Sequence, residues 1–264
     1  MTDKHTPTDA TEQLEKGKIL PLVFKLTVPA VIAQLITFVY NVVDRMFVAR
    51  IDGSGMDALA ALGIVLPVTL IIQAFANLIG LGGSPRASIK LGEDDKTEAD
   101  RIFNTSFVLL LAVGIVISIA TYFLSKQIVT AFGCPPSAVE LAASYLKIYA
   151  LGTVFVMLAQ GLNPFITAQG RSFIAMCSVS IGAVANIALD PIFIFTLGMG
   201  VEGASLATII SQALSCACIL AFFFSKRSLF RFRIKDAKPN GKRILSILSL
   251  GITPFVMTVT ECAI

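Results

Sequence analysis

Seven long apolar segments run through this chain, and they constrain its fold more than any other feature of the sequence. Each can cross about 30 Å of hydrocarbon as a helix. A helix is the default because the bilayer core offers the backbone no water to bond. The chain is 55% hydrophobic and 14% charged, whereas soluble chains are about one quarter charged. We therefore predict an all-α, polytopic bundle of membrane helices. The segments are Leu26–Ala49, Ala58–Gly83, Ile102–Leu124, Val139–Ala168, Phe173–Leu197, Ala204–Phe224 and Ile244–Ile264.

The lysines and arginines predict which side of the membrane each loop occupies. With a cytoplasmic N-terminus, all but four of the 21 fall on the inner side, as the positive-inside rule requires. The four exceptions are Arg45, Arg50, Lys126 and Lys147. We therefore predict that the basic run 226–243 lies next to the membrane, where it fixes the orientation of the neighbouring spans, and that it does not bind nucleic acid. The sequence thus predicts a multi-pass protein of the plasma (inner) membrane.

The residues needed for most enzyme or metal sites are missing from the sequence. The only histidine, His5, lies in a polar tail, and four of the five cysteines lie in apolar stretches without metal-ligand partners. No catalytic triad or zinc site can be assembled, so we predict neither an enzyme nor a resident metal or cofactor. Gly198, Gly200 and Gly203 spell G-x-G-x-x-G, but no strand precedes them, as a dinucleotide site would require. They predict a tight turn between two spans.

The start of a second structural repeat is visible in the seventh span. A shift of 225 residues places Ile19 on Ile244, Leu20 on Leu245, Pro29 on Pro254 and Val31 on Val256. Transporters are often built from such internal repeats. The predicted organisation is a polar cytoplasmic tail at 1–18, a six-helix lobe at 19–225, a basic cytoplasmic loop at 226–243 and the first helix of a second lobe at 244–264. On this prediction the chain is about half of a longer protein.

Charged residues within spans are few, and two aspartates fall at the same depth. At 1.5 Å per residue, Asp44 lies about 27 Å from the inner face and Asp190 about 26 Å. Asn186 lies at about 20 Å and Thr208 at about 22 Å by the same count. Intramembrane charges are costly and functional by default. An alternative is that these groups only join helices through hydrogen bonds.

Oxygen-bearing side chains at one depth suit a small cation. Two carboxylates, an amide and a hydroxyl are hard ligands such as sodium prefers, and they equally suit a proton carrier. Pro191 follows Asp190 directly and predicts a kink with a freed backbone carbonyl, and Pro29 predicts a second kink. Other polar residues within spans could face a substrate: Gln34, Tyr40, Asn41, Gln73, Asn77, Gln160 and Asn163.

At these positions the chain resembles the multidrug and toxic compound extrusion (MATE) family. The resemblance is carried by 26–50 with its aspartate, by NPFITAQGR at 163–171, by NIALDPIF at 186–193 and by GVEGASLATIISQ at 200–212. It implies twelve helices in two six-helix lobes, and monomeric exporters of small cationic, amphipathic drugs that exchange them for H⁺ or Na⁺. Asp44, Asn186, Asp190 and Thr208 would form the cation site. Some members also use a glutamate in helix seven, which Glu261 would match.

Three other functions remain as alternatives at this stage. A lipid-linked oligosaccharide flippase of the same superfamily would need a cationic cavity, and the spans hold only Arg45 and Lys147 as basic residues. A seven-helix receptor conflicts with the predicted cytoplasmic N-terminus and with the lack of a lysine in the seventh span. A membrane enzyme lacks a nucleophile–base pair.

Overall fold

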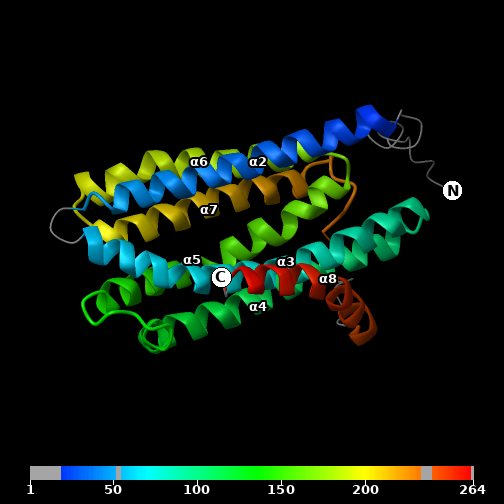
Figure 1. The fold of residues 1–264 in the computed structure, drawn as a ribbon. Helices are drawn as coiled ribbons and strands as arrows, with labels where there is room; N and C mark the ends of the chain where they lie inside the picture. The colour runs from blue at the N-terminus through cyan, green and yellow to red at the C-terminus, as the bar shows by residue number, and fades with distance from the viewer. Residues whose placement is uncertain (1–18, 52–54, 233–239, 263–264) are drawn as a thin grey trace.

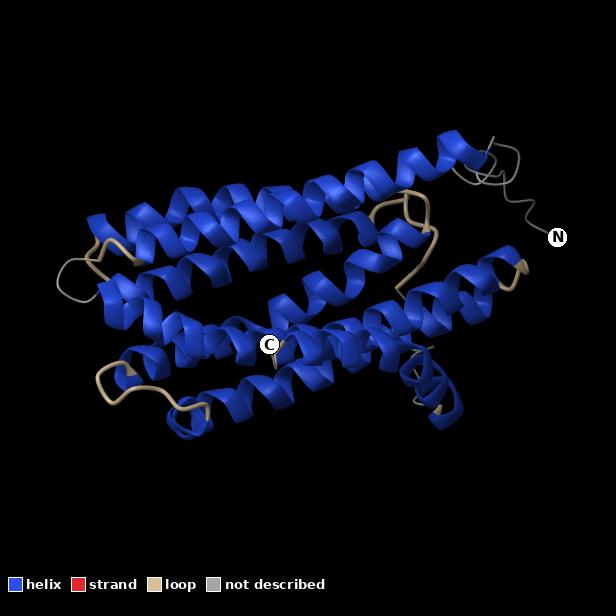
Figure 2. Ribbon diagram, viewed as in Figure 1, coloured by secondary structure: helices blue, strands red, loops and turns tan. Residues whose placement is uncertain are grey.

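The computed structural model describes residues 19–51, 55–232 and 240–262, and these consist of helices and their connecting loops (Figure 2). Seven of the helices are long and apolar enough to cross a membrane, which confirms the all-α fold class. The predicted tail 1–18 and residues 233–239 of the basic loop lie outside the described part. The helices are α2 (Ile19–Val48), α3 (Gly55–Gly92), α4 (Lys96–Ala131), α5 (Val139–Ala168), α6 (Ser172–Pro191), η1 (Ile192–Thr196), α7 (Gly200–Phe224) and α8 (Gly241–Glu261).

The helices lie side by side in two groups, one formed by α2, α6 and α7 and the other by α3, α4, α5 and α8 (Figure 1). Helix α5 joins the groups, because it packs on α7 as well as on α3 and α4. Helix α8 packs mainly on α3. The loops alternate between the two ends of the bundle. We call the end that carries the loops after α3, α5 and α7 the basic end; the sequence predicts that it faces the cytoplasm.

Glycines bring three helices into backbone contact around α3. A Cβ on Gly80 would lie 2.5 Å from the Gly161 carbonyl oxygen of α5. A Cβ on Gly251 would lie only 1.8 Å from the Leu78 carbonyl oxygen, and one on Gly82 would lie 2.2 Å from the Ile247 carbonyl oxygen. Small residues at such crossings let membrane helices approach closely, which is how they gain packing energy without a hydrophobic driving force between them. These contacts fix α3 against both α5 and α8.

The loop that follows α7 is held against the basic end of the bundle. The Arg231 amide donates to the Asp100 carboxylate at 2.9 Å, and the Leu229 amide donates to the Gln169 side chain at 2.7 Å. Between them Phe230, which is 1% exposed, stacks on Phe103 at a centroid separation of 5.3 Å. Buried backbone groups in a loop need such partners. Residues 225–232 therefore pack as part of the bundle.

The structure describes the predicted glycine turn and the two helices in which prolines predict kinks. Gly198 and Gly200 have φ of +65° and +56°, which confirms the tight turn. At Pro191, where we predicted a kink, α6 ends and the π-helix η1 follows at once. Proline lacks the N–H that would continue the α-helical ladder, and short π segments are frequent at functional sites. Helix α2 is one uninterrupted helix across Pro29.

Candidate functional site

Asp44 and Asp190 come together where α2 packs on α6. Their carboxyl groups lie within hydrogen-bonding reach of each other, and Asp190 is fully buried. Two ionised carboxylates at this separation repel each other strongly in a medium of low dielectric. A proton shared between them, or a cation bound to both, removes that repulsion. The arrangement of the pair therefore fits the cation or proton site predicted from the sequence.

Asn186 completes one side of this pair, since it lies one helical turn before Asp190. Its side-chain amide donates to Asp190 Oδ1 at 3.3 Å, and both residues are buried. Three oxygens of the group are buried without a hydrogen-bond partner: Asp44 Oδ1, Asp190 Oδ2 and Asn186 Oδ1. Leaving buried acceptors unsatisfied is expensive. A hard cation such as Na⁺ would satisfy all three, whereas a proton would satisfy two of them by joining one oxygen to another; these residues therefore fit either coupling ion that the sequence predicts.

Thr208 lies on α7 beside the same group, although its hydroxyl is engaged locally. It donates to the Ala204 carbonyl at 3.0 Å. The oxygen can still accept a bond, and the Tyr145 hydroxyl of α5 is within reach of it. Tyr145 thus lies between Thr208 and Asp44 and can interact with both. Direct contact between its oxygen and an ion bound by the aspartates stays a prediction.

Two tyrosines, Tyr40 and Tyr145, lie beside the aspartates, and Tyr149 packs on Tyr145; of the three, only Tyr40 was predicted from the sequence. Tyr145 and Tyr149 lie one helical turn apart on α5, are at most 5% exposed, and stack with ring centroids 6.1 Å apart. Tyr145 is close enough to Asp44 to feel its charge, and Tyr40 is close enough to both aspartates. Buried tyrosine hydroxyls usually find a hydrogen-bond partner. The i, i+4 spacing of Tyr145 and Tyr149, which places two hydroxyls on one face of a membrane span, was the signal that could have found them.

A cavity of about 570 Å³ opens beside this group, between the two groups of helices. Asn186, Thr208 and Tyr40 form its wall on the side of the aspartates. Most other polar lining groups are amides or hydroxyls. The cavity residues predicted from the sequence that line it are Gln34, Tyr40, Gln73, Asn77, Gln160 and Asn163.

Asn41 is the exception among the predicted cavity residues. It is exposed, it does not line the cavity, and its side chain donates to the Thr37 carbonyl at 2.8 Å. Successive residues are turned by about 100° around a helix. Because Tyr40 faces the cavity, Asn41 faces outward.

Glu261 lines the cavity on the α8 side. Next to it, Asn77 of α3 donates to Thr258 of α8 at 3.3 Å, which ties the two helices together there. Glu261 is the only charged side chain among the described residues that line the cavity. The polar cavity thus carries one carboxylate of its own besides the aspartate pair behind its wall.

Comparison with known proteins gives the family. The MatE family profile matches residues 29–192. The multidrug export protein MepA of Staphylococcus haemolyticus (strain JCSC1435) is 31% identical over 245 residues, which is 93% of this chain and 54% of that protein. MepA of Staphylococcus aureus (strain MSSA476) is 29% identical over the same shares. The chain therefore spans about half the length of the curated relatives it matches.

Solved structures agree with this match. A MOP superfamily transporter from Pyrococcus furiosus superposes with a TM-score of 0.87 at 29% identity, over 96% of this chain and 56% of that one. The outward-facing conformation of a multidrug resistance MATE family transporter gives the same values. These relatives are named as transporters and not as enzymes. With its seven apolar helices and a profile match across most of the first lobe, the chain is a multi-pass membrane protein that belongs to the MatE family, the multidrug and toxic compound extrusion transporters.

Proposed function

We propose that this chain provides the cation site and one wall of the drug cavity of a secondary multidrug exporter in the plasma membrane, which exchanges cationic amphipathic drugs for H⁺ or Na⁺. The observation that carries the proposal is the pair Asp44 and Asp190, the first half-buried and the second fully buried, which interact beside a polar cavity. The names of the relatives, multidrug export protein and multidrug resistance transporter, support the same class of substrate.

The chemistry of the proposed cycle follows from the charge of the pair. Without a bound ion, the two carboxylates attract a cationic drug into the cavity from the inner side. Entry of a proton or Na⁺ from the outer side neutralises them, so the drug loses its electrostatic partner and leaves. Ion and drug then oppose each other because both are drawn to the same negative charge.

The flippase alternative is not favoured by the cavity. A lipid-linked oligosaccharide carries phosphates, which need basic partners. No lysine or arginine lines the cavity among the described residues. A carboxylate in the lining and two behind its wall favour a cationic substrate.

Asp44→Asn tests whether the two carboxylates act as one site. In proteoliposomes carrying the intact protein, we expect Asp44→Asn and the Asp44→Asn/Asp190→Asn double variant to lose gradient-driven dye efflux to the same extent. Groups that serve one site are strongly non-additive. Losses that multiply in the double variant would instead assign the two residues separate roles.

Gln34→Ala tests the cavity as the site of the drug. Removing one hydrogen-bonding side chain from the lining should raise the KM for a dye about two- to tenfold, the range expected for one hydrogen bond. Asn41→Ala is the matched control, since it removes an amide from the outward face of the same helix and should leave KM unchanged. Equal effects of the two variants would place the substrate elsewhere.

A further inference from the structure

A second, smaller cavity of about 270 Å³ lies at the basic end of the bundle, between α3, α4 and α8. It is separate from the drug cavity, with which it shares no lining residue. Four basic side chains line it: Arg86 and Lys90 from α3, and Lys242 and Arg243 from the start of α8. One acidic side chain, Glu98 of α4, lines it as well.

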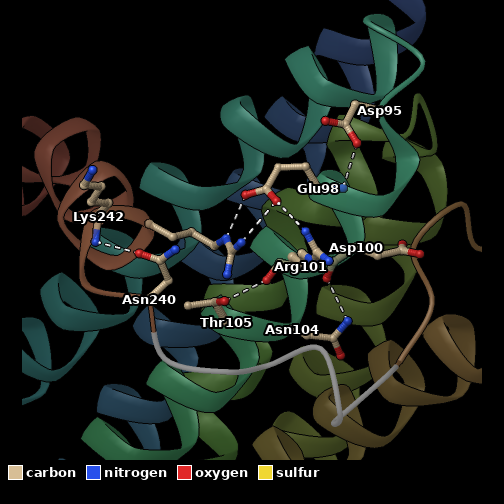
Figure 3. Close-up of polar contacts among 9 residues, drawn as sticks. Asp95, Glu98, Asp100, Arg101, Asn104, Thr105, Asn240 and Lys242 are labelled. Carbon is tan, nitrogen blue, oxygen red and sulfur yellow. Dashed lines mark hydrogen bonds and ion pairs between the residues drawn. The ribbon is translucent and has the colours of Figure 1, made fainter.

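The acidic side chain does not offset the basic ones, because its charge is already used. Arg243 binds Glu98 through two contacts, Nε–Oε1 at 2.8 Å and Nη2–Oε2 at 3.1 Å, and Arg101 approaches it at 3.5 Å. Figure 3 shows Glu98 at the centre of these dashed contacts. Lys90 pairs separately with Glu93 at 2.5 Å. Among the described residues, Arg86 and Lys242 are the two basic side chains of the cavity that form no ion pair.

Arg86 carries the clearest sign of a missing partner. Its Nε is buried and makes no hydrogen bond. A guanidinium N–H donates only, and leaving one unpaired in a buried position is costly. An acceptor in the cavity would satisfy it, and the positive charge of the lining selects an anionic acceptor.

The depth of the cavity places it among lipid headgroups. Arg86 lies about 42 Å along α3 from Ala58 at the outer end, close to the thickness of a bilayer with its headgroups. Ile89, which lines the cavity, is 57% exposed. Leu245 of α8, close in sequence to the lining residues Arg243 and Ser246, is 69% exposed. Apolar side chains exposed at this level can contact acyl chains while the basic residues contact a headgroup.

We propose that this cavity binds the phosphate of an anionic phospholipid from the inner leaflet, with Arg86 and Lys242 as its ligands. Basic pockets between membrane helices suit such headgroups, and guanidinium–phosphate bonds are among the stronger polar contacts. The bound lipid would join α3 and α8 at the basic end, where Glu98 and Arg243 already connect α4 to α8. The proposal does not depend on which drug or ion the protein carries.

Native mass spectrometry of the intact protein in neutral detergent tests this site directly. Phosphatidylglycerol is titrated against the wild type and against Arg86→Gln/Lys242→Gln, with phosphatidylcholine as the zwitterionic reference. We expect the double variant to bind phosphatidylglycerol about thirtyfold more weakly, as the loss of two cations near anionic lipid predicts. Lys226→Gln/Arg227→Gln is the matched control, because it removes the same charge from exposed positions at the same end and should change binding less than about twofold.

Three further outcomes are informative. Arg86→Lys/Lys242→Arg keeps the charge and should keep binding, which separates loss of the site from loss of the fold. Displacement of phosphatidylglycerol by millimolar inorganic phosphate would show that the cavity binds phosphate, but it would overturn the lipid as its ligand in favour of soluble phosphate. Equal binding of the two lipids to the wild type, or equal losses in both glutamine pairs, would overturn the proposal.

Discussion

Asp190→Asn in the intact protein is expected to abolish ion-coupled drug efflux while leaving the protein folded. The amide keeps the shape of the side chain and can still accept the Asn186 bond of 3.3 Å. It cannot take up a proton or balance a bound cation, so the pair can no longer alternate between charged and neutral states. Dye efflux from proteoliposomes with an imposed pH or Na⁺ gradient should fall to the rate measured without a gradient, because the intramembrane charge that carries the function is lost.

Glu202→Gln is the control for this variant. Glu202 is an exposed acid in the first turn of α7, so the substitution changes charge in the same way outside the site. It should transport at the wild-type rate. Wild-type efflux by Asp190→Asn, with thermal stability unchanged, would remove the aspartate pair from the proposed mechanism.

Gly251→Ala should destabilise the protein by about 2–3 kcal/mol, the upper range for overpacking a close contact. The added Cβ would lie 1.8 Å from the Leu78 carbonyl oxygen and 2.6 Å from its carbon. Both atoms are backbone, so no side chain can rotate away, and α8 must separate from α3. Thermal unfolding in detergent, followed by circular dichroism, measures the loss.

Gly63→Ala makes the same chemical change in α3, where no atom lies within 4 Å of the new Cβ. It should leave the unfolding temperature the same or slightly higher, because alanine favours the helix over glycine. If Gly63→Ala lowered stability as much as Gly251→Ala, the loss would come from the glycine backbone and not from the contact between α3 and α8.

The membrane spans could be predicted from the sequence because hydropathy alone specifies them. The ends of the helices could not: α3 and α4 have 38 and 36 residues, well beyond their apolar parts. Outside the hydrocarbon, polar local contacts determine where a helix begins. Asp95 caps α4 by accepting the Glu98 amide at 3.0 Å. A window of apolar residues carries no information about such a cap.

The aspartate pair could be predicted because depth along a helix is a matter of counting. Direction around the helix needs a packed neighbour, and depth alone could not distinguish Tyr40, which lines the cavity, from Asn41, which does not. Residues that act together through tertiary packing were also missed. Tyr145 lies near Asp44 because α5 packs on α7, which in turn packs on α6 beside α2. Arg86 meets Lys242 because α3 packs on α8.

The contact between α3 and α8 also has a mechanical consequence. At Gly82 and Gly251 the two backbones meet without side chains between them, and close-packed surfaces of this kind are not compressible. Neither helix can slide along the other by part of a turn without separating from it. Glu98 and Arg243 connect α8 to α4 as well. The repeat in the sequence predicts that a second lobe starts with α8, yet α8 is packed on the first bundle through backbone contacts. We therefore expect the predicted repeat and the rigid unit to end at different residues.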